Sequence, residues 1–331
     1  MEISDLVNKI NVLNEEGIKL TMQAPPRYDE ALAKHQEAVQ LSSDKNLNPD
    51  YHAFSTANVA YAIRRKAEPQ EKVLKLLDDA FQENMAAMGD WAAADSSRQE
   101  SYAGTARLLE EMTIVLRTSP KATKDDLMVA RGNVHMAVDL YESAVGNAPA
   151  EIITLPQLNS RLWRTLGVAS TVATDLSKYF PHERKVYLKE AIVYAQQELD
   201  VRTAAGEKNG SPLANAYHTL GVAQTELANR DKNMYLAAKD NLQLGRQHAH
   251  DAGQLMSVSV MTFREAWLEY KRSPLNKKTI GNLVQIVVNQ QSLEKMRWDN
   301  GVKNSLRARM TKLGAHLGGI YQQQIMQMYS V

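Results

Sequence analysis

MAVDLYESAVGNAP, at residues 136–149, is the stretch that decides the fold. Its Ala137, Tyr141 and Ala144 are spaced four and then three residues apart, so they lie on one face of an α-helix. Small residues on either side of a ring let a second helix approach closely, while the ring fills the remaining space. Pro149 closes the segment, because proline cannot continue a helix. The stretch therefore predicts a helix that packs tightly against a neighbour.

The same kind of face recurs along the chain, which predicts a series of similar helix pairs. Second helices of these pairs show it at Ala31, His35, Ala38, at Val73, Leu77, Ala80 and, in altered form, at Ala191, Ala195, Glu198. The expected first helices have a bulky residue followed four positions later by a small or short one, at Phe54/Asn58, Tyr102/Ala106, Trp163/Gly167 and Tyr217/Gly221. A glycine at the second position permits close contact between backbones.

Helical segments alternate with short breaks over the whole chain. Most breaks contain a proline, as in AEPQ, TSPK, NAPAE, YFPHE, KNGSP and RSPLN, and proline ends one helix or begins the next. Only EIITL and VSVMTF are rich in β-formers. We expect the first to be a loop and the second to be part of a helix. The chain is therefore predicted to be all-α.

An internal repeat supports this interpretation. WRTLGVASTVATDL begins at Trp163 and YHTLGVAQTELANR begins at Tyr217, with six of fourteen positions identical. Each is followed by a helical segment that begins with YL. A two-helix unit occurring twice is typical of helical repeat proteins.

These residues resemble the tetratricopeptide repeat family. Ala137, Tyr141, Ala144 and Pro149 match the second helix of that repeat, and Trp163, Leu166 and Gly167 match the first. The units here are longer than the 34 residues typical of the family. The resemblance implies a right-handed superhelix of about seven helix-turn-helix units. We expect residues 1–269 to form the repeat array, and residues 270–331 to continue it as diverged, basic repeats or a cap.

The resemblance also implies a concave surface lined by first helices, which would bind a protein or peptide. The lining positions of the family correspond to Arg161, Arg164, Thr171, Asn215, His218 and Thr225, and we expect the two arginines to be exposed. Asparagine can bind a peptide backbone, and arginine can bind carboxylates. The alternative is that these six are ordinary surface residues.

Charge is distributed unevenly although the whole chain has a formal net charge of only +1. Residues 270–331 contain 10 basic and 2 acidic side chains, including the basic patch Lys303, Arg307, Arg309 and Lys312. This end could bind an acidic protein or a nucleic acid. Only Tyr321 and Tyr329 are available there to stack on bases, which favours the acidic protein. Alternatively it is a solvated face, or it pairs with the acidic N-terminal end of a second copy.

Catalytic and metal-binding motifs are not found in this sequence. There is no cysteine, the histidines are not spaced as ligands, and no phosphate loop or nucleophile motif occurs. Adjacent carboxylates such as Glu110 and Glu111 are interpreted as solvated helix surface. We therefore expect a protein without enzymatic activity, metal or cofactor.

The remaining expectations concern location and role. The N-terminus has no apolar core of a signal peptide, and no segment is apolar and long enough to cross a membrane. We expect a cytoplasmic scaffold or adaptor that binds a protein or peptide. The alternatives are a regulator that senses a peptide and changes shape, and a nucleic-acid-associated factor that uses the basic C-terminal region.

Overall fold

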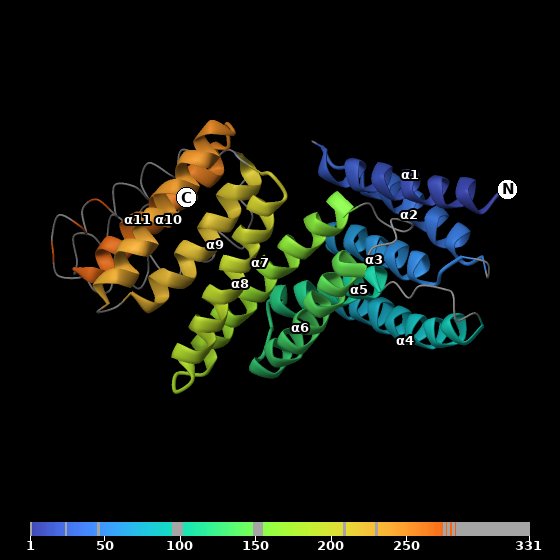
Figure 1. The fold of residues 1–331 in the computed structure, drawn as a ribbon, viewed down its shortest axis with the longest axis horizontal. Helices are drawn as coiled ribbons and strands as arrows, with labels where there is room; N and C mark the ends of the chain where they lie inside the picture. Colours follow the sequence, from blue (N-terminus) through green and yellow to red (C-terminus); the bar gives the residue numbers. More distant parts are fainter. Residues whose placement is uncertain are drawn as a thin grey trace. The chain divides into compact units, whose positions relative to one another are not determined.

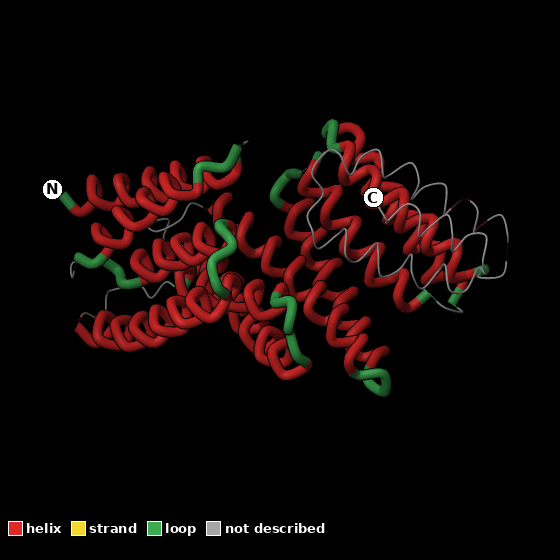
Figure 2. The backbone as a smooth tube through the Cα atoms, turned by 180° about the vertical axis from the view of Figure 1, so that it is seen from behind, coloured by secondary structure: helices red, strands yellow, loops and turns green. Residues whose placement is uncertain are grey.

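The computed structural model is all-helical in the part of the chain that it describes. That part comprises residues 2–23, 25–44, 47–94, 102–147, 155–207, 210–228 and 231–273, with residues 276, 279 and 282. Figures 1 and 2 show helices joined by short loops, with no strand in these ranges. The helices are α1 (Ile3–Met22), α2 (Tyr28–Ser42), α3 (Asp50–Arg65), α4 (Gln70–Ala94), α5 (Ala103–Thr118), α6 (Lys124–Asn147), α7 (Leu155–Tyr179), α8 (Arg184–Ala204), α9 (Ser211–Leu227), α10 (Lys232–Asp251) and α11 (Leu255–Arg272).

Several of the breaks between helices contain a proline. Pro49 is the residue before α3, Pro69 lies directly before α4, and Pro212 occupies the first turn of α9. VSVMTF lies within α11, as expected. EIITL lies outside the described residues except for its last residue, which begins α7. The prediction of an all-α chain is confirmed for the described ranges.

The chain divides into two compact units, Met1–Lys208 and Asn209–Val331. In the first unit each helix contacts the next one along the chain. In addition, α1 contacts α3, α3 contacts α5, and α5 contacts α7. The odd-numbered helices of this unit therefore form one layer, and α2, α4 and α6 each pack against the two odd-numbered helices beside them in sequence.

The second unit shows the same relationship in its described helices. Here α10 contacts both α9 and α11, and α11 also contacts α9. The expected boundary between residues 269 and 270 concerns a C-terminal segment that lies mostly outside the described residues, so it stays a prediction.

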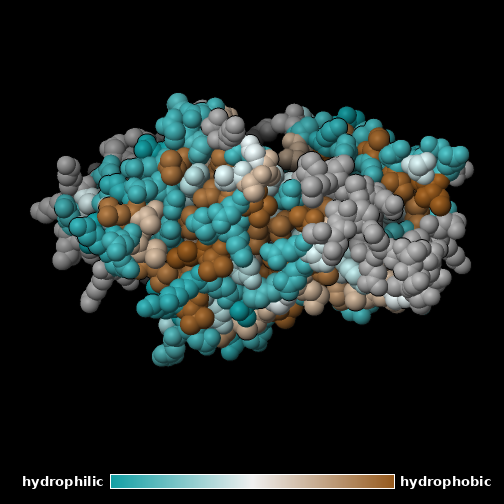
Figure 3. All heavy atoms as spheres, in the orientation of Figure 1, coloured by the Kyte–Doolittle hydropathy of each residue, from teal (hydrophilic) through white to brown (hydrophobic). Residues whose placement is uncertain are grey.

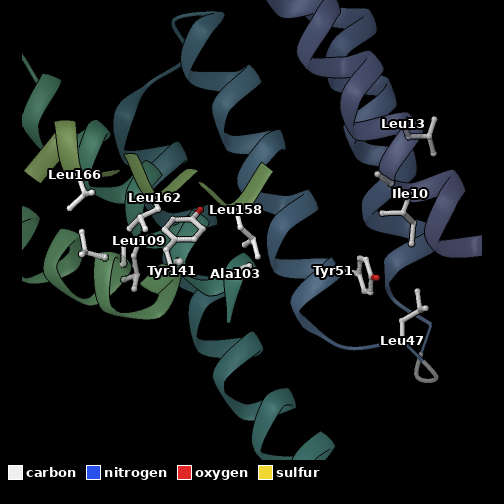
Figure 4. Close-up of a cluster of buried hydrophobic side chains, with 14 of the residues drawn as sticks. Ile10, Leu13, Leu47, Tyr51, Ala103, Leu109, Tyr141, Leu158, Leu162 and Leu166 are labelled. Atoms are coloured by element: carbon white, nitrogen blue, oxygen red, sulfur yellow. The ribbon is translucent and has the colours of Figure 1, made fainter. Parts of the chain in front are cut away.

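The face that opened the sequence argument packs in the interior of the first unit. Ala137 and Tyr141 of α6 are fully buried, and half-buried Ala144 packs against the same cluster. Figure 4 shows the ring of Tyr141 beside Leu109 of α5 and Leu158 and Leu162 of α7. The corresponding faces of α2, α4 and α8 are also buried. The prediction of a recurring packed face is therefore confirmed, with Ala144 at its edge.

Two glycines lie where a first helix and a second helix approach each other closely. A Cβ atom on Gly221 of α9 would lie 2.7 Å from Cγ of Leu242 and 3.3 Å from the backbone nitrogen of that residue in α10. A Cβ atom on Gly167 of α7 would lie 2.8 Å from Oε2 of Glu198 in α8. Both distances are too short for a side chain, as the sequence predicted.

A buried carboxylate connects two helices of the odd-numbered layer. Asp50, the first residue of α3, accepts hydrogen bonds from the backbone nitrogens of Gly104 at 2.6 Å and Thr105 at 3.0 Å. These amides lie in the first turn of α5, where they have no partner within the helix. Asp50 therefore caps α5 and helps to set its position against α3.

Hydrophobic side chains reach the surface in several places on the face shown in Figure 3, between hydrophilic ones. Met128, Val129 and Met136 on α6 are among the exposed large hydrophobic residues. Within the described residues, no helix is both long and apolar enough to span a membrane.

Candidate functional site

Arginine and glutamate side chains gather where α3, α5 and α7 meet in the odd-numbered layer. We call this group the arginine cluster, and its members are Arg64, Arg107, Glu110, Glu111, Arg161 and Arg164. The centre lies on α5, where Arg107 precedes Glu110 by three residues and Glu111 by four, so the three side chains can meet. The guanidinium of Arg107 lies 3.0 Å from Oε2 of Glu110 and 2.7 Å from Oε1 of Glu111. All three side chains are buried.

Two neighbouring helices supply further cations to the same carboxylates. Arg64 of α3 lies 3.0 Å from Oε2 of Glu111. Arg164 of α7 lies 2.8 Å from Oε1 of Glu110 and 3.5 Å from Oε1 of Glu111. The Arg64 and Arg164 side chains are 21 % and 38 % exposed. The cluster therefore has a buried centre and a rim that solvent reaches.

Arg161 is the unusual member of the cluster. Its guanidinium carbon lies 5.6 Å from the centre of the Phe54 ring, an arrangement typical of a cation–π contact. In the described part of the chain it forms no ion pair with a carboxylate. Burial, and then the nearby charge of Arg107, lower the pKa of Arg161 to about 10. Its charge is therefore poorly compensated.

Two tyrosines border the cluster. The ring centre of Tyr61 lies 5.5 Å from the guanidinium carbon of Arg64 and 5.9 Å from that of Arg107. The hydroxyl of Tyr141 is buried and has no hydrogen-bond partner. Burial and the charge of Glu110 raise the pKa of Tyr141, so this hydroxyl keeps its proton and remains available as a donor.

The cluster is suited to binding rather than to proton transfer. Burial alone would raise the pKa of Glu111, but Arg107, Arg64 and Arg164 lower it to about 2. Burial also opposes the charge of Arg107, yet Glu111 and Glu110 raise its pKa above the ordinary value. Both groups are ionised at neutral pH, so neither can exchange a proton there. What the arrangement offers is fixed positive charge and directed N–H donors.

The residues predicted on α7 fall in this region, but not as exposed positions. Arg164 is half-exposed and paired, and Arg161 is half-buried. Our expectation that both arginines are exposed is therefore wrong for Arg161 and only partly right for Arg164. The reason is that α7 packs against α5, whose glutamates hold Arg164 at the contact. Thr171 donates its hydroxyl to the backbone oxygen of Gly167 at 2.8 Å, within its own helix.

The other three predicted residues lie on α9, in the second unit. Asn215 is exposed, and Thr225 is buried with its hydroxyl donated to the oxygen of Gly221 at 2.6 Å. Nε2 of His218 is buried without a partner. Burial, and then the charge of Arg264, lower the pKa of His218 to about 3. This set belongs to a different unit from the α7 set.

The basic patch Lys303, Arg307, Arg309 and Lys312 lies outside the described residues, so its role stays a prediction. The described ranges contain no group of three or more histidine or acidic side chains that could hold a metal ion.

Sequence reasoning missed the centre of the cluster. Glu110 and Glu111 were expected on the solvated surface, and this is wrong, because both are fully buried. An arginine three and four residues before two glutamates was a local signal for an intrahelical pair. Nothing in the local sequence indicated the contribution of Arg64, which is 47 residues away from Glu111.

Comparison with known proteins gives no family for this chain. The sequence matches no protein-family model and no curated protein sequence.

Proposed function

We propose that the protein is a non-catalytic scaffold or adaptor that binds another protein or peptide. In this proposal the helix pairs form a superhelix similar to that of tetratricopeptide repeats, and the odd-numbered helices line the binding surface. Contacts between successive odd-numbered helices in each unit support this arrangement, because first helices of such repeats contact one another. The recurring packed faces of α2, α4, α6 and α8 support it too.

The arginine cluster is the observation on which the proposal rests. It lies on three successive odd-numbered helices, and its rim residues Arg64 and Arg164 are partly exposed. Arginine forks bind carboxylates and phosphates in pairs of hydrogen bonds. We therefore expect the ligand to present acidic groups to α3, α5 and α7.

Binding of short synthetic peptides, followed by fluorescence polarisation, tests this proposal. Peptides with acidic residues should bind more tightly than neutral peptides of the same length. Arg164→Lys keeps the charge but removes the fork, so it should weaken binding of acidic peptides by about tenfold or more.

The matched control is Arg131→Lys on α6. Arg131 is also half-buried and paired, with its Nε 2.9 Å from Oε1 of Glu190, but it lies outside the odd-numbered layer. This variant should bind acidic peptides as the wild type does. Equal losses in the two variants would contradict the proposed surface, and equal affinity for acidic and neutral peptides would contradict the proposed ligand.

A further inference from the structure

The charges of the arginine cluster do not balance. It contains four guanidinium groups, those of Arg64, Arg107, Arg161 and Arg164, but only the carboxylates of Glu110 and Glu111. Within the described residues, no other carboxylate pairs with any of the four arginines. The cluster therefore has two positive charges in excess. Uncompensated charge away from water is costly, so a surplus of this size at a partly buried place indicates a ligand.

The surplus is centred on Arg161. Arg107 and Arg164 are in direct contact with the two carboxylates, and Arg64 with Glu111. Arg161 instead lies over the ring of Phe54, where the repulsion of Arg107 is stronger than the attraction of Glu110 and Arg164 adds further repulsion. Its five N–H donors are therefore available to an acceptor from outside the chain.

Two more donors near Arg161 have no partner. Nε of Arg107 and the hydroxyl of Tyr141 are both buried and form no hydrogen bond. The Oε1 atoms of Glu110 and Glu111 are in ion-pair contact with arginines but accept no hydrogen bond either, so they do not satisfy these donors. Arg107 and Tyr141 both interact electrostatically with Arg161. Buried donors are normally paired, and these two unpaired donors belong to the same cluster that has too little negative charge.

We infer that the arginine cluster binds a doubly charged oxyanion group, of which a phosphate monoester is the simplest example, with Arg161 as its principal ligand. A phosphate monoester has a charge of about −1.5 to −2 at pH 7 and three strong acceptor oxygens. It therefore matches the excess charge and offers an acceptor oxygen to each of the three groups with free donors, Arg161, Arg107 and Tyr141, whereas a single carboxylate would leave one positive charge. If the ligand is a peptide, the group is a phosphorylated side chain. This assignment to a peptide rests on the function proposed above.

Thermal unfolding of the full chain with added inorganic phosphate tests the site without any peptide. Phosphate should raise the unfolding midpoint by a few degrees in a saturable manner, whereas chloride at the same ionic strength should not. Isothermal titration should give the affinity directly. An absence of any specific phosphate effect would overturn the inference.

Arg161→Gln separates a ligand site from a structural role. This variant removes one of the two surplus charges, so its midpoint without phosphate should equal or exceed that of the wild type. Its affinity for phosphate should fall by at least about tenfold. Arg131→Gln, which removes a similar half-buried arginine on α6, should leave phosphate affinity unchanged. An unchanged phosphate response in Arg161→Gln would place the ion elsewhere and overturn the assignment.

Three peptides of one sequence, containing serine, glutamate or phosphoserine at a single position, identify the source of the group. Tighter binding of the phosphoserine peptide, lost in Arg161→Gln, supports a phosphopeptide ligand. If free phosphate binds at Arg161 but no peptide does, the oxyanion site stands and the proposed scaffold function fails. If the glutamate and phosphoserine peptides bind equally, the ligand is a carboxylate, and the inference fails while the proposed function stands.

Discussion

The guanidinium of Arg107 lies 2.7 Å from Oε1 of Glu111, one turn further along α5, and neither side chain is more than 1 % exposed. Arg64 from α3 and Arg164 from α7 contact the same carboxylate. Glu111 therefore joins three helices through ionic contacts at the point where they meet. The pair is both part of the candidate site and part of the interior, and this double role decides which substitutions are informative.

Glu111→Gln should destabilise the protein strongly. It leaves Arg107 buried with one carboxylate fewer, and breaking a buried ion pair from one side costs about 3–5 kcal/mol. Urea denaturation followed by circular dichroism measures the change. Asp79→Asn is the control, because Asp79 and its partner Lys75 are both exposed, and its effect should be much smaller. Similar losses in both variants would show that the buried pair is not special.

Tyr141→Phe should leave the free energy of unfolding unchanged or raise it slightly. The hydroxyl of Tyr141 is buried without a partner, and an unsatisfied buried polar group is unfavourable. Tyr141→Ala removes the ring from the core between α5, α6 and α7 and should cost about 3–5 kcal/mol. A large loss in the phenylalanine variant would reveal a partner for the hydroxyl.

Gly221→Ala and Gly132→Ala should have opposite effects. The new methyl group at position 221 would lie 2.7 Å from Cγ of Leu242, so we expect a cost of about 1–3 kcal/mol from overpacking. A methyl group at Gly132 in α6 would meet nothing within 4 Å, and alanine is favoured over glycine in a helix by about 1 kcal/mol. Thermal or urea unfolding of the two variants gives the sign of each change.

Ala67→Gly should stabilise the protein. Ala67 follows α3 with φ of 65°, and the equivalent residues after α8 and α10 are Gly206 and Gly253, with φ of 84° and 67°. A left-handed conformation costs a non-glycine residue about 1–2 kcal/mol, so glycine should recover about 1 kcal/mol of this after its greater flexibility in the unfolded chain is counted. Gly206→Ala should change stability in the opposite direction, and a loss in both variants would contradict the explanation.

Acidification should destabilise the first unit through His35. Nδ1 of this buried side chain lies 3.1 Å from Oδ1 of Asn14, an atom that already accepts from Asn58, so we assign the proton to Nδ1. Nε2 is buried without a partner, and burial followed by the charge of Arg107 lowers the pKa of His35 to about 4.

The sign follows from the proton binding of the two states. Between pH 6.5 and about 4 the unfolded state binds a proton at His35 that the folded state does not. The contribution of His35 to the free energy of unfolding is therefore complete above pH 6.5 and is lost as the pH falls through this window. The loss from this group should be about 2–3 kcal/mol. His35→Gln should show a shallower fall in urea denaturation over the same range, and parallel curves would exclude His35 as the cause.

Local patterns in the sequence were sufficient for the helices and their packed faces. The spacing of Ala137 and Tyr141 predicted a buried face, and the prolines at positions 69 and 212 marked helix starts. The glycine at position 221 predicted a close approach. These features depend on residues a few positions apart, whose relation is set by the helix period itself.

The sequence by itself thus determined that this is an all-α protein of tightly packed helix pairs. Only the tertiary structure decided which charged residues are exposed, because that depends on helices far apart in the chain. Glu110 and Glu111 resemble ordinary surface acids until α3 and α7 bring Arg64 and Arg164 against them. The excess charge at Arg161 likewise depends on ionic contacts that involve three helices. It cannot be predicted from the sequence of any one helical segment.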